Sequence, residues 1–187
     1  SGSFSFTVPV LSDGSHDIMA VATDEAGNVS ASTIFTVMVD TTAPAAPELT
    51  GPSLTNSPST LTLTGTAEAG STVYFYDGGN FFDGGFFLGM KEADSGSFSF
   101  TVPVLSDGSH DITAVAYDPA INMSADTTLT VVVDTTAPVI TLSGSVSPTT
   151  AEAGFQYSDA GATADGGETV TPSGNVITNT VGTYIIT

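Results

Sequence analysis

The sequence has no cysteine and no tryptophan, and Lys91 is its single lysine or arginine against 20 aspartate and glutamate residues, which gives a formal net charge of −19. Because one basic side chain cannot replace the counterions of a phosphate backbone, nucleic acid is excluded as a partner. The same deficit argues against binding to an anionic membrane surface. Without cysteine there are no disulfides, so buried apolar side chains must hold the fold together.

So many carboxylates without basic partners favour a cation as ligand. Ca²⁺ prefers oxygen ligands, tolerates irregular coordination and is abundant outside cells, so even weak sites fill there. The hydrophobic content of 40% is sufficient for packed cores and argues against a disordered acidic chain. No apolar run of membrane-spanning length occurs, so no membrane insertion is expected in this segment.

The first 44 residues return almost unchanged as residues 95–138, with 35 of the 44 paired positions identical. A constant spacing of 94 residues is typical of tandem modules. The repeat predicts that residues 1–40 are the C-terminal part of one module, 41–136 a complete module and 137–187 the N-terminal part of a further module.

Short stretches of alternating apolar and polar residues, bounded by glycine, proline, aspartate or serine, fill most of the sequence and predict β-strands. In residues 97–104, for example, Phe98 and Phe100 fall on one face while Ser99 and Thr101 fall on the other. No segment sustains the spacing of an amphipathic helix, so no substantial helix is expected. Within the complete module we predict seven strands, near residues 46–50, 60–66, 72–76, 86–92, 97–104, 111–117 and 127–134.

Seven short strands with frequent turns indicate an all-β fold, with antiparallel β-sandwiches of the immunoglobulin type. An Ala-Pro pair follows the last strand of each copy, at Pro44 and Pro138. Proline prevents the strand ladder from continuing and stiffens a very short linker. Consecutive modules are therefore expected to stack end to end.

The first and last segments would each leave apolar faces and strand edges uncovered on their own. The favoured interpretation is that the sequence is a window of a longer polypeptide. The alternative is strand exchange, in which residues 1–40 of a neighbouring chain complete the last segment. Joining those two segments would place one strand twice in the same module, which counts against exchange.

Three stretches carry a resemblance to a known family: LTLTGTAEAGSTVYFYDGG, LSDGSHDITAVAYDPAINMS and VVVDTTAP. They resemble the bacterial immunoglobulin-like repeats of giant cell-surface adhesins and biofilm-associated proteins. Residues 135–187 are similar to a related variety through PVITLSG, YSDAGATA and VGTYIIT. The resemblance implies extracellular display, tandem repetition and Ca²⁺ at module junctions. The turn at Asp118 departs from the family's D-x-A-G-N pattern because it lacks the glycine.

Strand directions give a separate argument for where ions bind. The loops after the second, fourth and sixth strands of the module return to the end at which its first strand begins, and the linker arrives there too. Like charges gathered at one place are unfavourable unless a cation neutralises them. The candidate Ca²⁺ ligands at this junction and the next are Asp13, Asp40, Glu68, Asp107, Asp118, Asn122 and Asp134. The competing interpretation for Asp13 and Asp107 is that an aspartate before glycine forms a turn.

A catalytic site is not expected. His16 and His110 occur in a repeated Gly-Ser-His-Asp sequence, but neighbouring residues on a strand point to opposite faces and cannot form a proton relay. A structural role for both histidines is therefore favoured, and no zinc spacing or phosphate-binding glycine loop occurs.

The hairpin over residues 74–90 is unusually rich in phenylalanine, and Phe81 and Phe82 fall at its expected tip. Exposed aromatic side chains there would mark a contact surface, so lateral contact through these two residues is one hypothesis. The alternative is that the rings fold back over the edge of the sandwich.

Taken together, these features predict a non-enzymatic stalk segment of a large extracellular bacterial adhesin or surface filament, with neighbouring modules as partners and Ca²⁺ stiffening their junctions. Two alternatives stay open. One is an accessory module of a secreted polysaccharide-degrading enzyme, and the other is a structural subunit of a surface fibre or lattice.

Overall fold

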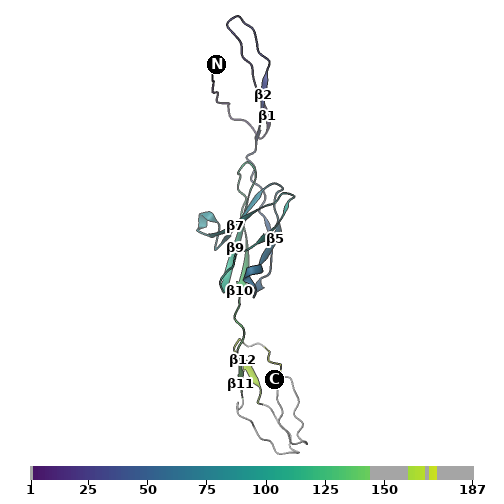
Figure 1. The fold of residues 1–187 in the computed structure, drawn as a ribbon, viewed down its shortest axis with the longest axis vertical. Coiled ribbons are helices and arrows are strands. Elements are labelled where there is room, and N and C mark those ends of the chain that lie inside the picture. The colour runs from purple at the N-terminus through teal and green to yellow at the C-terminus, as the bar shows by residue number, and fades with distance from the viewer. Residues whose placement is uncertain (1, 144–159, 167–168, 172–187) are drawn as a thin grey trace, which may run out of the picture. The chain divides into compact units, whose positions relative to one another are not determined.

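The computed structural model describes residues 2–143, 160–166 and 169–171. The chain divides into two compact units, Ser1–Thr135 and Thr136–Thr187, which are treated separately (Figure 1). In the described residues the regular structure is β-strand apart from two three-residue 3₁₀ turns. The all-β fold class predicted from the alternation is confirmed.

The first copy of the repeat forms an antiparallel hairpin of β1 (Gly14–Ala20) and β2 (Thr33–Val39), which pair in register along their whole length. The large apolar side chains of this first copy are mostly exposed: Phe4 is 84% exposed and Phe35 is 68% exposed.

The complete module consists of two sheets that enclose a core (Figure 1). One sheet has the order β3-β5-β8 and the other has the order β4-β10-β9-β6-β7. Pairing is antiparallel except between β4 and β10. The strand bounds are Glu48–Thr50 for β3, Leu54–Thr55 for β4, Thr62–Thr66 for β5, Thr72–Asp77 for β6, Phe86–Glu92 for β7, Ser97–Thr101 for β8, Gly108–Tyr117 for β9 and Thr127–Val133 for β10.

Period-two alternation sets which side chains enter the core, because successive residues of a strand face opposite sides. The Phe75 ring is fully buried and stacks on Phe100 of the facing sheet, with ring centroids 4.1 Å apart. Gly65 is required where β5 passes β3, since a Cβ atom there would lie 1.9 Å from the backbone oxygen of Glu48.

The seven predicted strands are all present in the module, and their ends differ from prediction by a few residues. The strand β8 ends at Thr101, two residues before Pro103, which has no N–H to donate to the ladder; Val102 still donates its N–H to the backbone oxygen of Leu61. The strand β4 was not predicted, since two residues are too few to show alternation. The 3₁₀ turns η1 (Pro58–Thr60) and η2 (Phe81–Asp83) were also not predicted.

In the second unit, β11 (Ile140–Leu142) and β12 (Ala162–Ala164) form a short antiparallel pair. The Val139 N–H donates to the Asp165 carboxylate at 2.9 Å. The rest of the module fragment predicted over residues 137–187, namely 144–159, 167–168 and 172–187, lies outside the described residues.

Candidate functional site

The turn between β9 and β10 is built around Asp118, which is 5% exposed. Its carboxylate accepts hydrogen bonds from the backbone N–H of Asn122 at 2.9 Å and from the Asn122 side-chain amide at 2.8 Å. Burial alone would raise the pKa of Asp118, but these hydrogen bonds and those from the backbone of Ala120 and Ile121 lower it below its usual value. The carboxylate is therefore ionised at neutral pH.

The linker before the module is held by hydrogen bonds from two directions. The side-chain amide of Asn122 donates to the backbone oxygen of Asp40 at 3.0 Å. On the other side, the Asp13 carboxylate accepts from the backbone N–H of Thr41 at 3.1 Å and from its hydroxyl at 2.9 Å. Contacts thus link Asp13, Asp40, Asn122 and Asp118 in one series at the start of the module, and their role as Ca²⁺ ligands stays a prediction.

The same arrangement recurs at the end of the module, where the Asp107 carboxylate accepts from the backbone N–H and the hydroxyl of Thr135 at 3.1 and 2.7 Å. Asp134 donates its own N–H to the backbone oxygen of Thr55. At both positions the carboxylate caps the linker that follows its hairpin, a contact over 28 positions rather than the local turn considered for an aspartate before glycine.

Two further predicted ligands, Glu68 and Asp40, have carboxylates that take no part in the hydrogen bonds described above. Glu68 is exposed in the β5–β6 loop, and its backbone oxygen accepts from Ser71. The Asp40 carboxylate accepts from the N–H of Thr42 at 2.9 Å. Across residues 2–143, 160–166 and 169–171, no three acidic or histidine side chains form a group that could hold a metal ion. Calcium binding at the junctions therefore stays a prediction.

His110 makes contacts that explain its place without catalysis. Its Nδ1 lies 2.7 Å from the Asp77 carboxylate and its Nε2 lies 3.0 Å from the backbone oxygen of Ser106. His16 makes the equivalent contact to Ser12 at 2.7 Å. Both rings thus bind the backbone of the turn that precedes their strand, and a structural role stays the favoured interpretation.

The phenylalanine-rich hairpin bends so that its tip lies over the outer face of the five-stranded sheet, the face turned away from the core. Asn80 caps the 3₁₀ turn by accepting from the N–H groups of Phe82 and Asp83, and its amide donates to the Asp126 carboxylate at 3.1 Å. Phe81 and Phe82 stay 69% and 71% exposed. The fold thus combines the two alternatives: the loop folds back, yet both rings face solvent, and lateral contact through them stays a prediction.

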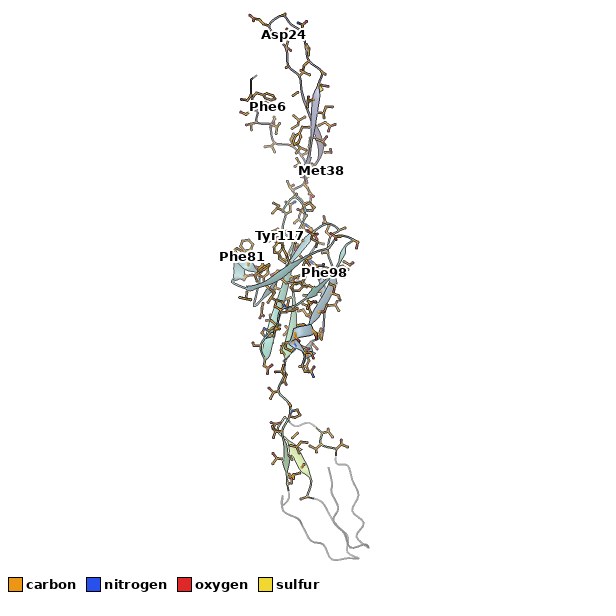
Figure 2. All side chains as sticks on the ribbon, in the orientation of Figure 1. Phe6, Asp24, Met38, Phe81, Phe98 and Tyr117 are labelled. Atoms are coloured by element: carbon orange, nitrogen blue, oxygen red, sulfur yellow. The ribbon has the colours of Figure 1, made fainter. Side chains whose placement is uncertain are left out.

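Beside this tip the outer face is hollowed. The hollow, called here the outer-face hollow, has a volume of about 450 Å³, and its walls include Tyr74, Tyr76, Phe81, Tyr117, Asp118 and Ile121. The rings of Tyr74 and Tyr117 meet edge to face, with centroids 5.3 Å apart and planes at 76°. Figure 2 shows Phe81 and Tyr117 on the same side of the module. Burial under this cover raises the pKa of the Tyr76 hydroxyl.

The outer-face hollow was not predicted from the sequence. One signal for it was available: the two copies of the repeat differ at nine positions, and four of these lie in the turn that borders the hollow. Thr23, Glu25, Gly27 and Val29 in the first copy correspond to Tyr117, Pro119, Ile121 and Met123 in the second.

The fold and junction contacts define a β-sandwich of the immunoglobulin class. The family model of the bacterial Ig-like domain matches residues 1–41 and 50–135, which together make up well over half of the chain. The chain therefore belongs to the bacterial Ig-like domain family. A comparison with curated proteins gave no significant match. In the described residues, no helix is both long and apolar enough to span a bilayer.

Three solved structures are similar to this chain at low identity. The fibronectin(III)-like modules of CbhA from Clostridium thermocellum are 20% identical over 66% of this chain, with a TM-score of 0.40, and the match spans 64% of that structure. A superoxide reductase from Ignicoccus hospitalis is 15% identical over 49% of this chain and 82% of its own, with a TM-score of 0.36. The PKD domain of an M14-like peptidase from Thermoplasmatales archaeon SCGC AB-540-F20 is 24% identical over 48% of this chain and 94% of its own, with a TM-score of 0.35.

Proposed function

We propose that this chain is a non-enzymatic spacer from a large extracellular bacterial adhesin or surface filament, whose work is to hold modules at a set distance and angle. The observation that carries the proposal is the fixed linker: Asp40 and Thr41 lie between the Asn122 amide and the Asp13 carboxylate. A flexible tether needs no such contacts, whereas a stiff joint does.

Repetition supports the same role. Asp107 and Thr135 reproduce the contacts of Asp13 and Thr41 one module later. A joint built twice from the same residues gives each module the same exit direction, which is what a tandem array needs in order to extend regularly.

Calcium is the second part of the proposal. Asp40, Asp118 and Asn122 gather oxygen atoms at the joint, and the carboxylates of a chain with a net charge of −19 repel one another. A carboxylate has about four acceptor sites, so the Asp40 carboxylate, which accepts from the N–H of Thr42, has room for a cation as well. Ca²⁺ binding would relieve the repulsion and restrict the joint further. The dissociation constant is expected in the millimolar range typical of extracellular modules.

The test is a distance measurement across the joint. Because the chain has no cysteine, two cysteines introduced at exposed positions are the only sites for spin labels. The pair across the joint is Ser15→Cys with Thr64→Cys. We expect a narrow distribution of label distances with Ca²⁺ and a broader one with chelator. In Asn122→Ala the distribution should broaden in both conditions, because the amide bridge to Asp40 is lost.

A label pair inside the module, Thr64→Cys with Ser109→Cys, is the control and should be insensitive to chelator. Equal widths with and without Ca²⁺ across the joint would overturn the calcium part alone. A broad distribution in every condition would overturn the spacer itself.

A further inference from the structure

The outer-face hollow is an open depression whose lining has features found in ligand sites. Its walls combine aromatic rings with hydroxyl groups and a single carboxylate, that of Asp118. Sites for small molecules are concave and mostly apolar, with few convergent polar groups. The rings come from three separate parts of the module: Tyr74 from β6, Phe81 from the hairpin tip and Tyr117 from the end of β9.

Backbone strain occurs at the rim. Ile121 has a φ of 71°, in the left-handed region that β-branched residues avoid. The first copy has glycine at this position, Gly27, with a φ of 88°, so the turn itself does not need isoleucine. The Ile121 side chain is 78% exposed and gains little from burial. Strain that folding does not require is typical of functional sites.

The differences between the copies point to the same place. The replacement of Thr23 and Gly27 by Tyr117 and Ile121 adds two walls of the hollow while leaving the aspartate–asparagine turn unchanged. In an otherwise near-identical pair of segments, two of the nine differences therefore fall on this surface.

The shape and charge of the hollow select the class of ligand. The rings of Tyr74 and Tyr117 meet edge to face at 76°, so together they present no flat platform on which a sugar ring could stack. Ring faces are electronegative and attract cations. Asp118 adds a full negative charge to this wall, and its hydrogen-bond partners, Asn122 and the backbone of Ala120 and Ile121, bring no positive side chain to neutralise it.

From these observations we propose that the outer-face hollow binds a quaternary ammonium group of the size of trimethylammonium, as carried by choline or by choline headgroups. The methyl groups contact the rings of Tyr74, Tyr117 and Phe81, and Asp118 supplies the counter-charge. The site shares Asp118 with the proposed calcium joint but takes its rings from the sheet face of the module, so Tyr117→Thr, which changes no proposed calcium ligand, distinguishes the two.

The first test needs no variant. Calorimetric titration of the intact chain with choline is compared with titration by 3,3-dimethyl-1-butanol, a neutral molecule of the same shape. We expect choline to bind at least about tenfold more tightly, since cation attraction to partly desolvated rings and a carboxylate is of that order. Equal binding of both, or binding of neutral sugars in place of choline, would overturn the proposal.

Variants then place the site. Tyr117→Thr installs the residue of the first copy and should weaken choline binding by about tenfold. Asp118→Asn should weaken it similarly, while the matched variant Asp24→Asn, in the same turn of the first copy, should leave it unchanged. If Asp24→Asn and Asp118→Asn change choline binding equally, the outer-face hollow is not the binding site and the proposal is overturned.

A vesicle arm distinguishes the source of the group. Retention on phosphatidylcholine vesicles that is lost in Tyr117→Thr would assign the site to headgroups on a surface. Binding of free choline without retention would assign it to the soluble molecule. Retention that is unaffected by Tyr117→Thr, without binding of free choline, would overturn the proposal.

Discussion

Phe4 and Phe98 occupy the same position in the two copies of the repeat, yet Phe4 is 84% exposed and Phe98 is 6% exposed. The valines four residues further along differ in the same way: Val8 is 37% exposed and Val102 is 2% exposed. The sequence around each pair is the same. What differs is the front part of the module, residues 46–92, which covers the second copy.

The local structure, in contrast, is shared by both copies. The Asp24 carboxylate accepts from the N–H and the amide of Asn28 at 2.8 Å each, as Asp118 does from Asn122. Hydrogen bonds between neighbours in sequence thus shape the turn in either setting. The comparison teaches that strand pairing and turns are encoded within these segments, whereas burial is supplied from outside them.

The largest expected effect tests that separation directly. Phe98→Ala should lower the free energy of unfolding by about 3–5 kcal/mol, because it leaves a cavity beside the buried Phe75 ring. Phe4→Ala should change it by less than about 0.5 kcal/mol, since that ring is already in solvent. Urea unfolding of both variants measures the difference. Equal losses would show that the first copy is buried too.

The same reasoning explains what the sequence could predict of the fold. Alternation locates strands because a residue's face depends on its neighbours two positions away, and all seven strands of the module were found in this way. The two-residue strand β4 is fixed by its pairing with Val132 and Val133, which no local pattern reveals. The 3₁₀ turn at the hairpin tip depends on the Asn80 cap in the same way.

The junction was predictable and the hollow was not, for a physical reason. Loop directions follow from strand order, so the meeting of Asp40 with Asn122 could be expected. The outer-face hollow depends on where the hairpin tip comes to rest, which the contact between Asn80 and Asp126 decides over 46 positions of sequence. The expectation that carboxylates would meet one another missed how readily backbone N–H groups, hydroxyls and amides satisfy them.

A smaller effect is expected at Ile121, where the copies differ in backbone strain. Ile121→Gly should stabilise the module by about 0.5–1 kcal/mol, as relief of the left-handed conformation outweighs the added freedom of the unfolded chain. The control is Ile121→Val, which keeps the β-branch and should give no gain. If both variants leave the unfolding midpoint unchanged, the turn is not strained.

The smallest effect is expected at the histidines, which differ because the front part of the module supplies Asp77 to His110 alone. Burial by itself would lower the pKa of His110, but the hydrogen bond and charge of Asp77 and the backbone oxygen of Ser106 raise it above its usual value. The pair should contribute about 0.2–1 kcal/mol. A folded-state pKa above the unfolded one means that this contribution is complete below about pH 6.5 and is lost as the pH rises through the raised value.

Asp77→Asn should therefore destabilise the module at about pH 5 more than at about pH 9, and should shift the nuclear magnetic resonance titration of the His110 ring to lower pH. His110→Gln in the Asp77→Asn background should cause little further pH dependence, because the ion pair is already absent. If the titration of His110 is the same with and without Asp77, the 2.7 Å contact is not the cause of the raised pKa of His110.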